Sequence, residues 1–179
     1  MSLGLDILLK LVSERQLVKY LADRELTNPE GAGFDIRVGE LYELTGPGYL
    51  GIESRRTSPT NRIASHEENP GQRVLVPKGA YYLVKTLEWV NMPSDIEAWI
   101  SVRTTLFRCG VRLDATKVNA GYEGWLTFGL NNAGPFDFEL EMGSRIAHIT
   151  FEPIQGEGRS YRGQWQGGRV STEGFEKQT

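Results

Sequence analysis

The stretch Phe136-Asp137-Phe138-Glu139-Leu140-Glu141 alternates strictly between apolar and acidic residues. Successive side chains of a β-strand point to opposite faces, so this pattern predicts a strand with one buried and one solvated face. Phe136, Phe138 and Leu140 are predicted to point into the core.

Further strand-like runs lie on both sides of this stretch. Tyr81-Tyr82-Leu83-Val84 and Ala98-Trp99-Ile100 precede it, and residues 145–151 follow it. Glycine and proline separate these runs at short intervals. Short strands with regular turns are typical of an all-β sandwich or barrel, so the sequence predicts a mainly β fold.

One helical pattern is expected, close to the N-terminus. Residues 13–16 (Ser-Glu-Arg-Gln) match a capping box, with a hydroxyl at the cap and an amide three residues later. The helix that this box would open places Leu17, Tyr20 and Leu21 on one face. The Pro- and Gly-containing residues 28–33 are expected to break it.

Two polar segments are predicted to lie outside the core. Residues 54–72 have almost no large apolar side chain, which predicts a long exposed loop. Residues 156–179 are also polar but carry Tyr161, Trp165 and Phe175. We predict a flexible C-terminal lid, or an arm that docks on a neighbouring subunit, with simple disorder as the alternative. The predicted division is therefore residues 1–155 for a β domain with its N-terminal helix, and residues 156–179 for the lid of the same domain.

Composition narrows the class of protein. The chain has 179 residues, 39% hydrophobic and 24% charged, which is ordinary for one globular domain. Its net charge of −3 argues against a nucleic-acid partner. Its first residues lack the pattern of a signal peptide, and no apolar run reaches the ~20 residues that span a bilayer, so no membrane association is expected. Cys109 is the single cysteine, which fits a reducing cytoplasm and, with only two histidines, argues against a Cys/His zinc site.

Two neighbouring segments carry the candidate chemistry. Residues 102–111 place two arginines and two hydroxyls within six positions, a set suited to oxyanions such as phosphates. Residues 119–124 (Asn-Ala-Gly-Tyr-Glu-Gly) form a Gly-rich turn with one aromatic ring, which a β-hairpin could hold against a flat ligand. Together they indicate a nucleotide site. The alternative is a surface arginine cluster beside a core tyrosine.

Five blocks of the sequence, in order, resemble the dCTP deaminase and dUTPase superfamily, and the deaminase branch most closely. The blocks are residues 31–37 (Gly-Ala-Gly-Phe-Asp-Ile-Arg), 103–108 (Arg-Thr-Thr-Leu-Phe-Arg), 119–124, 143–148 (Gly-Ser-Arg-Ile-Ala-His) and 161–168 (Tyr-Arg-Gly-Gln-Trp-Gln-Gly-Gly). The resemblance implies a distorted β-barrel or jelly roll that assembles as a homotrimer, with the ligand bound between chains. It also implies a pyrimidine deoxynucleoside triphosphate as the ligand, with Mg²⁺ bound through the triphosphate and no metal site in the protein.

The resemblance also assigns expected roles to single residues. Tyr122 would stack under the deoxyribose and exclude a 2′-hydroxyl, and Asp35 would hold a neighbouring arginine. The expected nucleotide-binding residues are Arg103, Thr104, Thr105, Asn119, Tyr122, Arg145 and Gln164. The expected catalytic residues are Arg108, Asn119 and Thr104, with Arg108 near the attacking water.

The chain also departs from the family at several positions. Asn119 stands where the family has an aspartate, and asparagine cannot accept a proton as a general base. Gly129 stands where the deaminases carry a proton-shuttling glutamate. Ser160 replaces a phosphate-binding lysine of the lid, a role that Arg162 or Arg169 could take over.

These departures leave three possible functions open. Deamination of dCTP to dUTP and ammonia is the reading that the overall resemblance favours. Pyrophosphate release from dUTP or a related deoxynucleotide is the first alternative, and catalytically weak, regulatory deoxynucleotide binding is the second.

Overall fold

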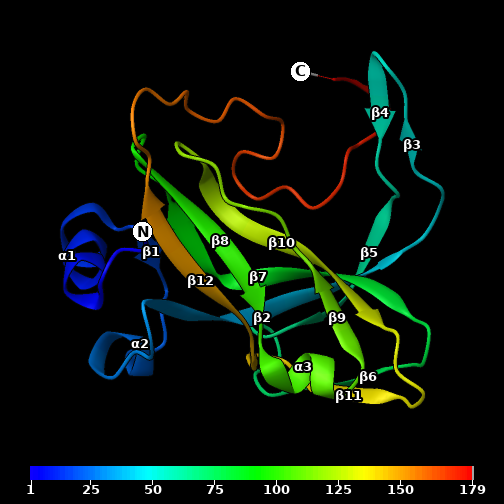
Figure 1. Ribbon diagram of the computed structural model, residues 1–179. Helices are drawn as coiled ribbons and strands as arrows, with labels where there is room; N and C mark the ends of the chain where they lie inside the picture. The colour runs from blue at the N-terminus through cyan, green and yellow to red at the C-terminus, as the bar shows by residue number, and fades with distance from the viewer. Residues whose placement is uncertain (179) are drawn as a thin grey trace.

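The computed structural model describes residues 1–178, which form three short helices and thirteen strands (Figure 1). The helices are α1 (Leu5–Arg15), α2 (Asp23–Thr27) and α3 (Thr104–Arg108). The strands are β1 (Val18–Lys19), β2 (Gly33–Leu44), β3 (Tyr49–Leu50), β4 (Ser54–Arg56), β5 (Thr60–Ser65), β6 (Arg73–Val76), β7 (Tyr81–Asn91), β8 (Ile96–Val102), β9 (Val111–Asp114), β10 (Glu123–Asn132), β11 (Phe138–Glu141), β12 (Arg145–Pro153) and β13 (Glu176–Lys177). No helix within residues 1–178 is long and apolar enough to cross a membrane.

The main antiparallel sheet has the strand order β8-β12-β2-β7-β10-β9, with β1 and β5 paired to β7 and β2. Its two ends meet, because Ala98 of β8 and Val118, which follows β9, exchange backbone hydrogen bonds of 2.9 and 2.8 Å. The sheet therefore curls into a distorted barrel, as predicted (Figure 1).

The core fills the inside of this barrel. β7 buries alternate side chains from Val84 to Val90, as a strand with one covered face does, whereas β2 buries every residue from Gly33 to Gly39 except Arg37. Phe34 and Phe151 are fully buried and meet edge to face, with ring centroids 6.2 Å apart. The strands predicted at residues 81–84, 98–100 and 145–151 are confirmed.

The prediction for the N-terminal helix was wrong in its position. α1 begins after Gly4 and ends at Arg15, where Gln16 adopts a left-handed conformation with φ of 53°. Ser13 lies in the last turn, and its hydroxyl donates to the Lys10 carbonyl oxygen at 3.0 Å. The apolar spacing that starts at Leu5, with Leu8 fully buried, determines the helix, and the capping-box match downstream of it does not.

Two further predictions need correction. Residues 54–72 contain β4 and β5, and β5 pairs with β2, with Ala64 opposite Leu41. β4 lies between β3 and β13 in a small separate sheet, and both β4 and β5 form through backbone pairing, which the polar composition of the segment does not reveal. The strand predicted from Phe136 begins at Phe138. Leu140 is buried and Phe138 packs against the core, whereas Phe136 is 79% exposed in the preceding turn.

The C-terminal segment, residues 156–178, crosses the open end of the barrel from β12 to β4 (Figure 1). Its one short strand, β13, pairs with β4. Tyr161 and Trp165 pack against the core, and Phe175 contacts Tyr49 at a centroid distance of 5.5 Å. The described part of this segment is thus held by contacts to its own chain.

Candidate functional site

A cavity of about 680 Å³ lies between the end of the barrel and the C-terminal segment. The turn before β10 and the first half of β10 form one wall. Tyr161, Trp165, Arg169 and Val170 cover the cavity from the C-terminal segment. None of the described residues that line it is an aspartate or a glutamate.

Tyr122 forms part of the cavity wall. The turn that carries it begins with Gly121 at φ of 73°, and the Tyr122 amide donates to the Asn119 carbonyl oxygen at 3.2 Å. The Tyr122 hydroxyl donates to the Trp125 carbonyl oxygen at 2.6 Å, which fixes the ring. Burial raises the pKa of Tyr122 to about 12, so the phenol stays neutral at physiological pH.

Asn119 lines the same cavity three residues before Tyr122. The turn thus brings together two of the residues predicted to contact the sugar. The Asn119 side chain offers one hydrogen-bond acceptor and two donors, but no basic oxygen.

Gly129 lies on β10, opposite Leu83 on β7 and Asp114 on β9. A side chain there would collide with Tyr81, since a Cβ built on Gly129 would lie 2.7 Å from Tyr81 Cζ. Tyr81 lines the cavity. A phenol therefore fills the space that a side chain at position 129 would need.

A second cluster gathers around Asp35 on β2, a carboxylate that is 5% exposed. Asp35 Oδ2 accepts hydrogen bonds from Arg103 and, at 2.8 Å, from Arg145. Asp35 Oδ1 lies 3.0 Å from His148 Nδ1, because β2 and β12 pair with His148 opposite Asp35. The prediction that Asp35 holds a neighbouring arginine is confirmed.

Burial and neighbouring charges shift the pKa values of two side chains in this cluster. Burial lowers the pKa of His148, which favours a neutral imidazole at pH 7. Burial, together with the charges of Arg145 and Arg24, also lowers the pKa of Arg103. Arg103 and Arg145 still expose 29% and 34% of their side chains. Arg24 Nη1 also lies 3.7 Å from Asp35 Oδ2, so three arginines share one carboxylate at a surface that an anion can reach.

The remaining residues predicted for phosphate binding and catalysis lie beside this cluster. Arg103 directly precedes α3, and Leu106 anchors the helix in the core. Thr104, Thr105 and Arg108 are exposed on α3. α3 lies at the end of the barrel opposite the C-terminal segment (Figure 1). Within a single chain, these residues and Arg145 therefore lie far from the cavity that Asn119 and Tyr122 line.

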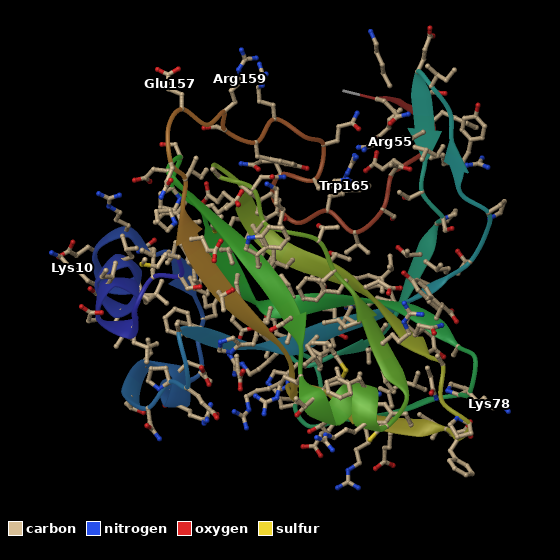
Figure 2. The ribbon with its side chains drawn as sticks, viewed as in Figure 1. Lys10, Arg55, Lys78, Glu157, Arg159 and Trp165 are labelled. Carbon is tan, nitrogen blue, oxygen red and sulfur yellow. The ribbon has the colours of Figure 1, made fainter. Side chains whose placement is uncertain are left out.

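Two arginines flank the cavity: Arg169, which the sequence suggested as a substitute for the lysine of the lid, and Arg55, which the sequence did not single out. The guanidinium groups of Arg55 and Arg169 lie 4.5 and 5.2 Å from the Trp165 ring centroid. Figure 2 shows Arg55 on β4 beside Trp165 of the C-terminal segment. Arg169 makes two hydrogen bonds of 2.6 Å to Glu176 of β13, and β13 pairs with β4, so this latch ties the middle of the segment to the strand that docks on β4.

Gln164 lies in the same segment but does not line the cavity. Its side-chain amide donates to the Lys177 carbonyl oxygen. Its Oε1 atom is buried without a hydrogen-bond partner. In this arrangement Gln164 supports the segment and does not face the cavity.

A closed antiparallel barrel with a tyrosine-walled cavity under a C-terminal cover defines a ligand-binding β-barrel. A family model described as dCTP deaminase-like matches residues 5–154. The chain therefore belongs to the dCTP deaminase-like family, as the sequence blocks predicted.

Among the individual relatives, some are named dCTP deaminase and one is named as a deoxyuridine 5′-triphosphate nucleotidohydrolase. The dCTP deaminase of Pyrobaculum calidifontis is 32% identical over 144 residues, which cover 78% of each chain. A probable deoxyuridine 5′-triphosphate nucleotidohydrolase of Methanothermobacter thermautotrophicus is 30% identical over 157 residues, which cover 87% of this chain and 99% of the relative.

Solved structures share the fold. The dCTP deaminase of Agrobacterium tumefaciens superimposes with a TM-score of 0.65 at 20% identity, over 86% of this chain and 48% of that longer chain. A dUTPase of a Staphylococcus aureus phage, described with a structural Mg(II) ion, gives a TM-score of 0.50 at 14% identity, over 80% of this chain and 94% of that one.

Proposed function

We propose that this protein binds a pyrimidine deoxynucleoside triphosphate and deaminates dCTP to dUTP. The observation that carries the proposal is the cavity wall built by Asn119 and Tyr122 in a chain of the dCTP deaminase-like family. The base and the deoxyribose occupy the cavity, and the Tyr122 ring packs against the sugar where a 2′-hydroxyl would lie. Binding is therefore selective for deoxynucleotides.

The phosphates bind Arg103, Thr104, Thr105 and Arg145 of a second copy of the chain. This part of the proposal rests on their position at the opposite end of the barrel from the cavity of their own chain. A guanidinium fork and exposed hydroxyls suit phosphate oxygens. Closing such head-to-tail contacts into a ring gives a homotrimer with three shared sites. Arg108, Thr104 and Asn119 lie nearest the reacting atoms in this assembly.

Mg²⁺ binds through the triphosphate and neutralises part of its charge. Within residues 1–178, no group of three or more His, Cys, Asp or Glu side chains could hold a metal. Mg²⁺ commonly keeps several waters and binds substrate phosphates, so the chain fits an ion carried by its ligand.

In this proposal the protein is a cytoplasmic enzyme, and residues 156–179 act as the lid of its site. Arg169 lines the cavity next to Trp165 and supplies a cation to the phosphates in place of the lysine that Ser160 replaces. Gln164 reaches the nucleotide once the lid closes on it.

Pyrophosphate release from dUTP is the second candidate reaction. The Methanothermobacter relative, which this chain matches over 99% of its length, favours it. The absence of a carboxylate among the described lining residues favours the third candidate, regulatory binding with little turnover.

Product analysis separates the three. The purified protein is incubated with Mg²⁺ and, in turn, dCTP, dUTP, dTTP, CTP and UTP, and ammonia and pyrophosphate are measured. The proposal expects ammonia from dCTP and none from CTP, with Arg103→Ala as the inactive control. Pyrophosphate from dUTP establishes the second candidate, and tight binding without either product establishes the third.

A further inference from the structure

Tyr81, which lines the cavity, packs against Gly129. Tyr81 is the first residue of β7 and pairs with Asn131 on β10. Gly129 lies two residues before Asn131, on the same face of the strand. Gly129 is not among the glycines with positive φ, so its backbone does not require glycine. What Gly129 provides is space for the Tyr81 ring.

Tyr81 brings a neutral hydroxyl to a mainly apolar end of the cavity. Leu83 and Phe128 line the cavity beside it. Burial and the nearby Asp114 carboxylate both raise the pKa of Tyr81, so the phenol keeps its proton at physiological pH. It can donate one hydrogen bond and accept others.

A second hydroxyl in the cavity lining lacks a partner. Thr127, two residues before Gly129, lines the cavity, and its Oγ1 atom is buried without a hydrogen-bond partner. Buried polar atoms are almost always satisfied, so this one points to a ligand or to water. Two neutral hydroxyls therefore line the cavity, one from β7 and one from β10.

We propose that the hydroxyls of Tyr81 and Thr127 bind the polar edge of the pyrimidine, with Tyr81 at the group on ring position 4, and that Gly129 clears the space for Tyr81 to do so. This assignment rests on the proposed function, and it makes Tyr81 a specificity-determining residue. Neutral hydroxyls that both donate and accept match the carbonyl and amino groups of an uncharged pyrimidine. A side chain at position 129 needs volume that the Tyr81 ring occupies in this structure, so the ring would have to move to admit it.

Tyr81→Phe tests the assignment because it removes one oxygen and keeps the ring. The Kd values of dCTP, dUTP and the triphosphate of 2-pyrimidinone deoxyriboside, which lacks the group at ring position 4, are measured by calorimetry. Losing one hydrogen bond weakens dCTP or dUTP roughly two- to tenfold, and binding of the 2-pyrimidinone analogue stays unchanged. Tyr82→Phe, the next residue on β7 and not a lining residue, is the matched control and changes none of the three.

Other outcomes separate this assignment from the proposed function. An equal loss for all three nucleotides, or no loss for any, overturns the role of Tyr81 and leaves the proposed function intact. An unmodified protein that binds none of the nucleotides overturns both. As a second test, Gly129→Ala, which displaces the Tyr81 ring, should lower dCTP affinity by at least as much as Tyr81→Phe. Unchanged dCTP affinity in a folded Gly129→Ala protein contradicts the proposal.

Discussion

The rings of Tyr122 and Tyr161 meet edge to face, with centroids 5.4 Å apart and planes at 75°. Tyr122 belongs to the cavity wall and Tyr161 to the C-terminal segment. The Tyr161 amide also donates to the Ala120 carbonyl oxygen at 2.7 Å. The wall and its cover are therefore coupled directly.

Replacing Tyr161 should loosen the cover. An aromatic pair of this kind contributes about 0.5–1.5 kcal/mol beyond its buried area. Tyr161→Ala is expected to weaken nucleotide binding by up to about tenfold and to speed proteolysis within residues 156–178, whereas Tyr161→Phe stays close to the unmodified protein. Limited proteolysis and calorimetry measure the two effects. Equal protease resistance in all three proteins would rule out the coupling.

Asp35→Asn should destabilise the fold and weaken phosphate binding together. The substitution leaves Arg103 and Arg145 without their shared anion. We expect a loss of about 3 kcal/mol, the lower end of the range for a broken buried ion pair, since both arginines reach solvent. Urea denaturation measures this loss. Glu43→Gln is the control, because Glu43 accepts one exposed hydrogen bond from Asn61. If Asp35→Asn lowers the free energy of unfolding no more than Glu43→Gln does, the cluster contributes little to stability.

The latch between Arg169 and Glu176 should open in acid. The hydrogen bond from Arg169 lowers the pKa of Glu176 below its ordinary value of 4.5. A carboxyl with a lowered pKa stabilises the docked segment above its ordinary pKa and loses this effect as the pH falls through the lowered value. The fluorescence of Trp165, which contacts Arg169, should therefore change in acid before the fold is lost. In Glu176→Gln that early change should be missing, and its persistence would assign it to another group.

Asn119→Asp should restore a general base to the cavity wall. If turnover depends on a carboxylate there, the substitution raises it by ~10²–10⁴-fold. Single-turnover measurements with dCTP and dUTP give the rates. Brisk turnover of the unmodified protein that Asn119→Asp leaves unchanged would mean that another residue takes the proton.

The strands of the barrel were predictable because short strand-like runs separated by glycine and proline are a local property of the sequence. The runs at residues 81–84 and 145–151 needed only their own side chains to reveal a buried face. β5 was not predictable in this way, since its stability comes from backbone pairing with β2. The register of β2 against β12, which places His148 opposite Asp35, depends on residues more than 100 positions apart.

The candidate site shows the same limit. Asn119 and Tyr122 share one turn, so their proximity followed from the sequence. Tyr81 and Gly129 meet only through the pairing of β7 with β10, a contact that no local pattern of residues indicates. The separation of Arg103 from Tyr122 within one chain likewise required the closed barrel.

The central claim is that each site combines the cavity of one chain with the phosphate-binding residues of another. Arg103→Ala should weaken triphosphate binding about tenfold or more, through a lost charge-assisted hydrogen bond of roughly 1.5–3 kcal/mol. A double substitution, Asn119→Ala with Tyr122→Ala, should disable the cavity. Arg103→Ala and the double variant are then co-assembled in equal amounts, and tight dCTP sites are counted by titration. We predict that about one quarter of the sites recover full affinity, because random ring assembly pairs an intact cavity with an intact phosphate cluster at that frequency. No recovery in properly assembled mixtures, or full-affinity binding by a stable monomer of the unmodified protein, would contradict the shared site.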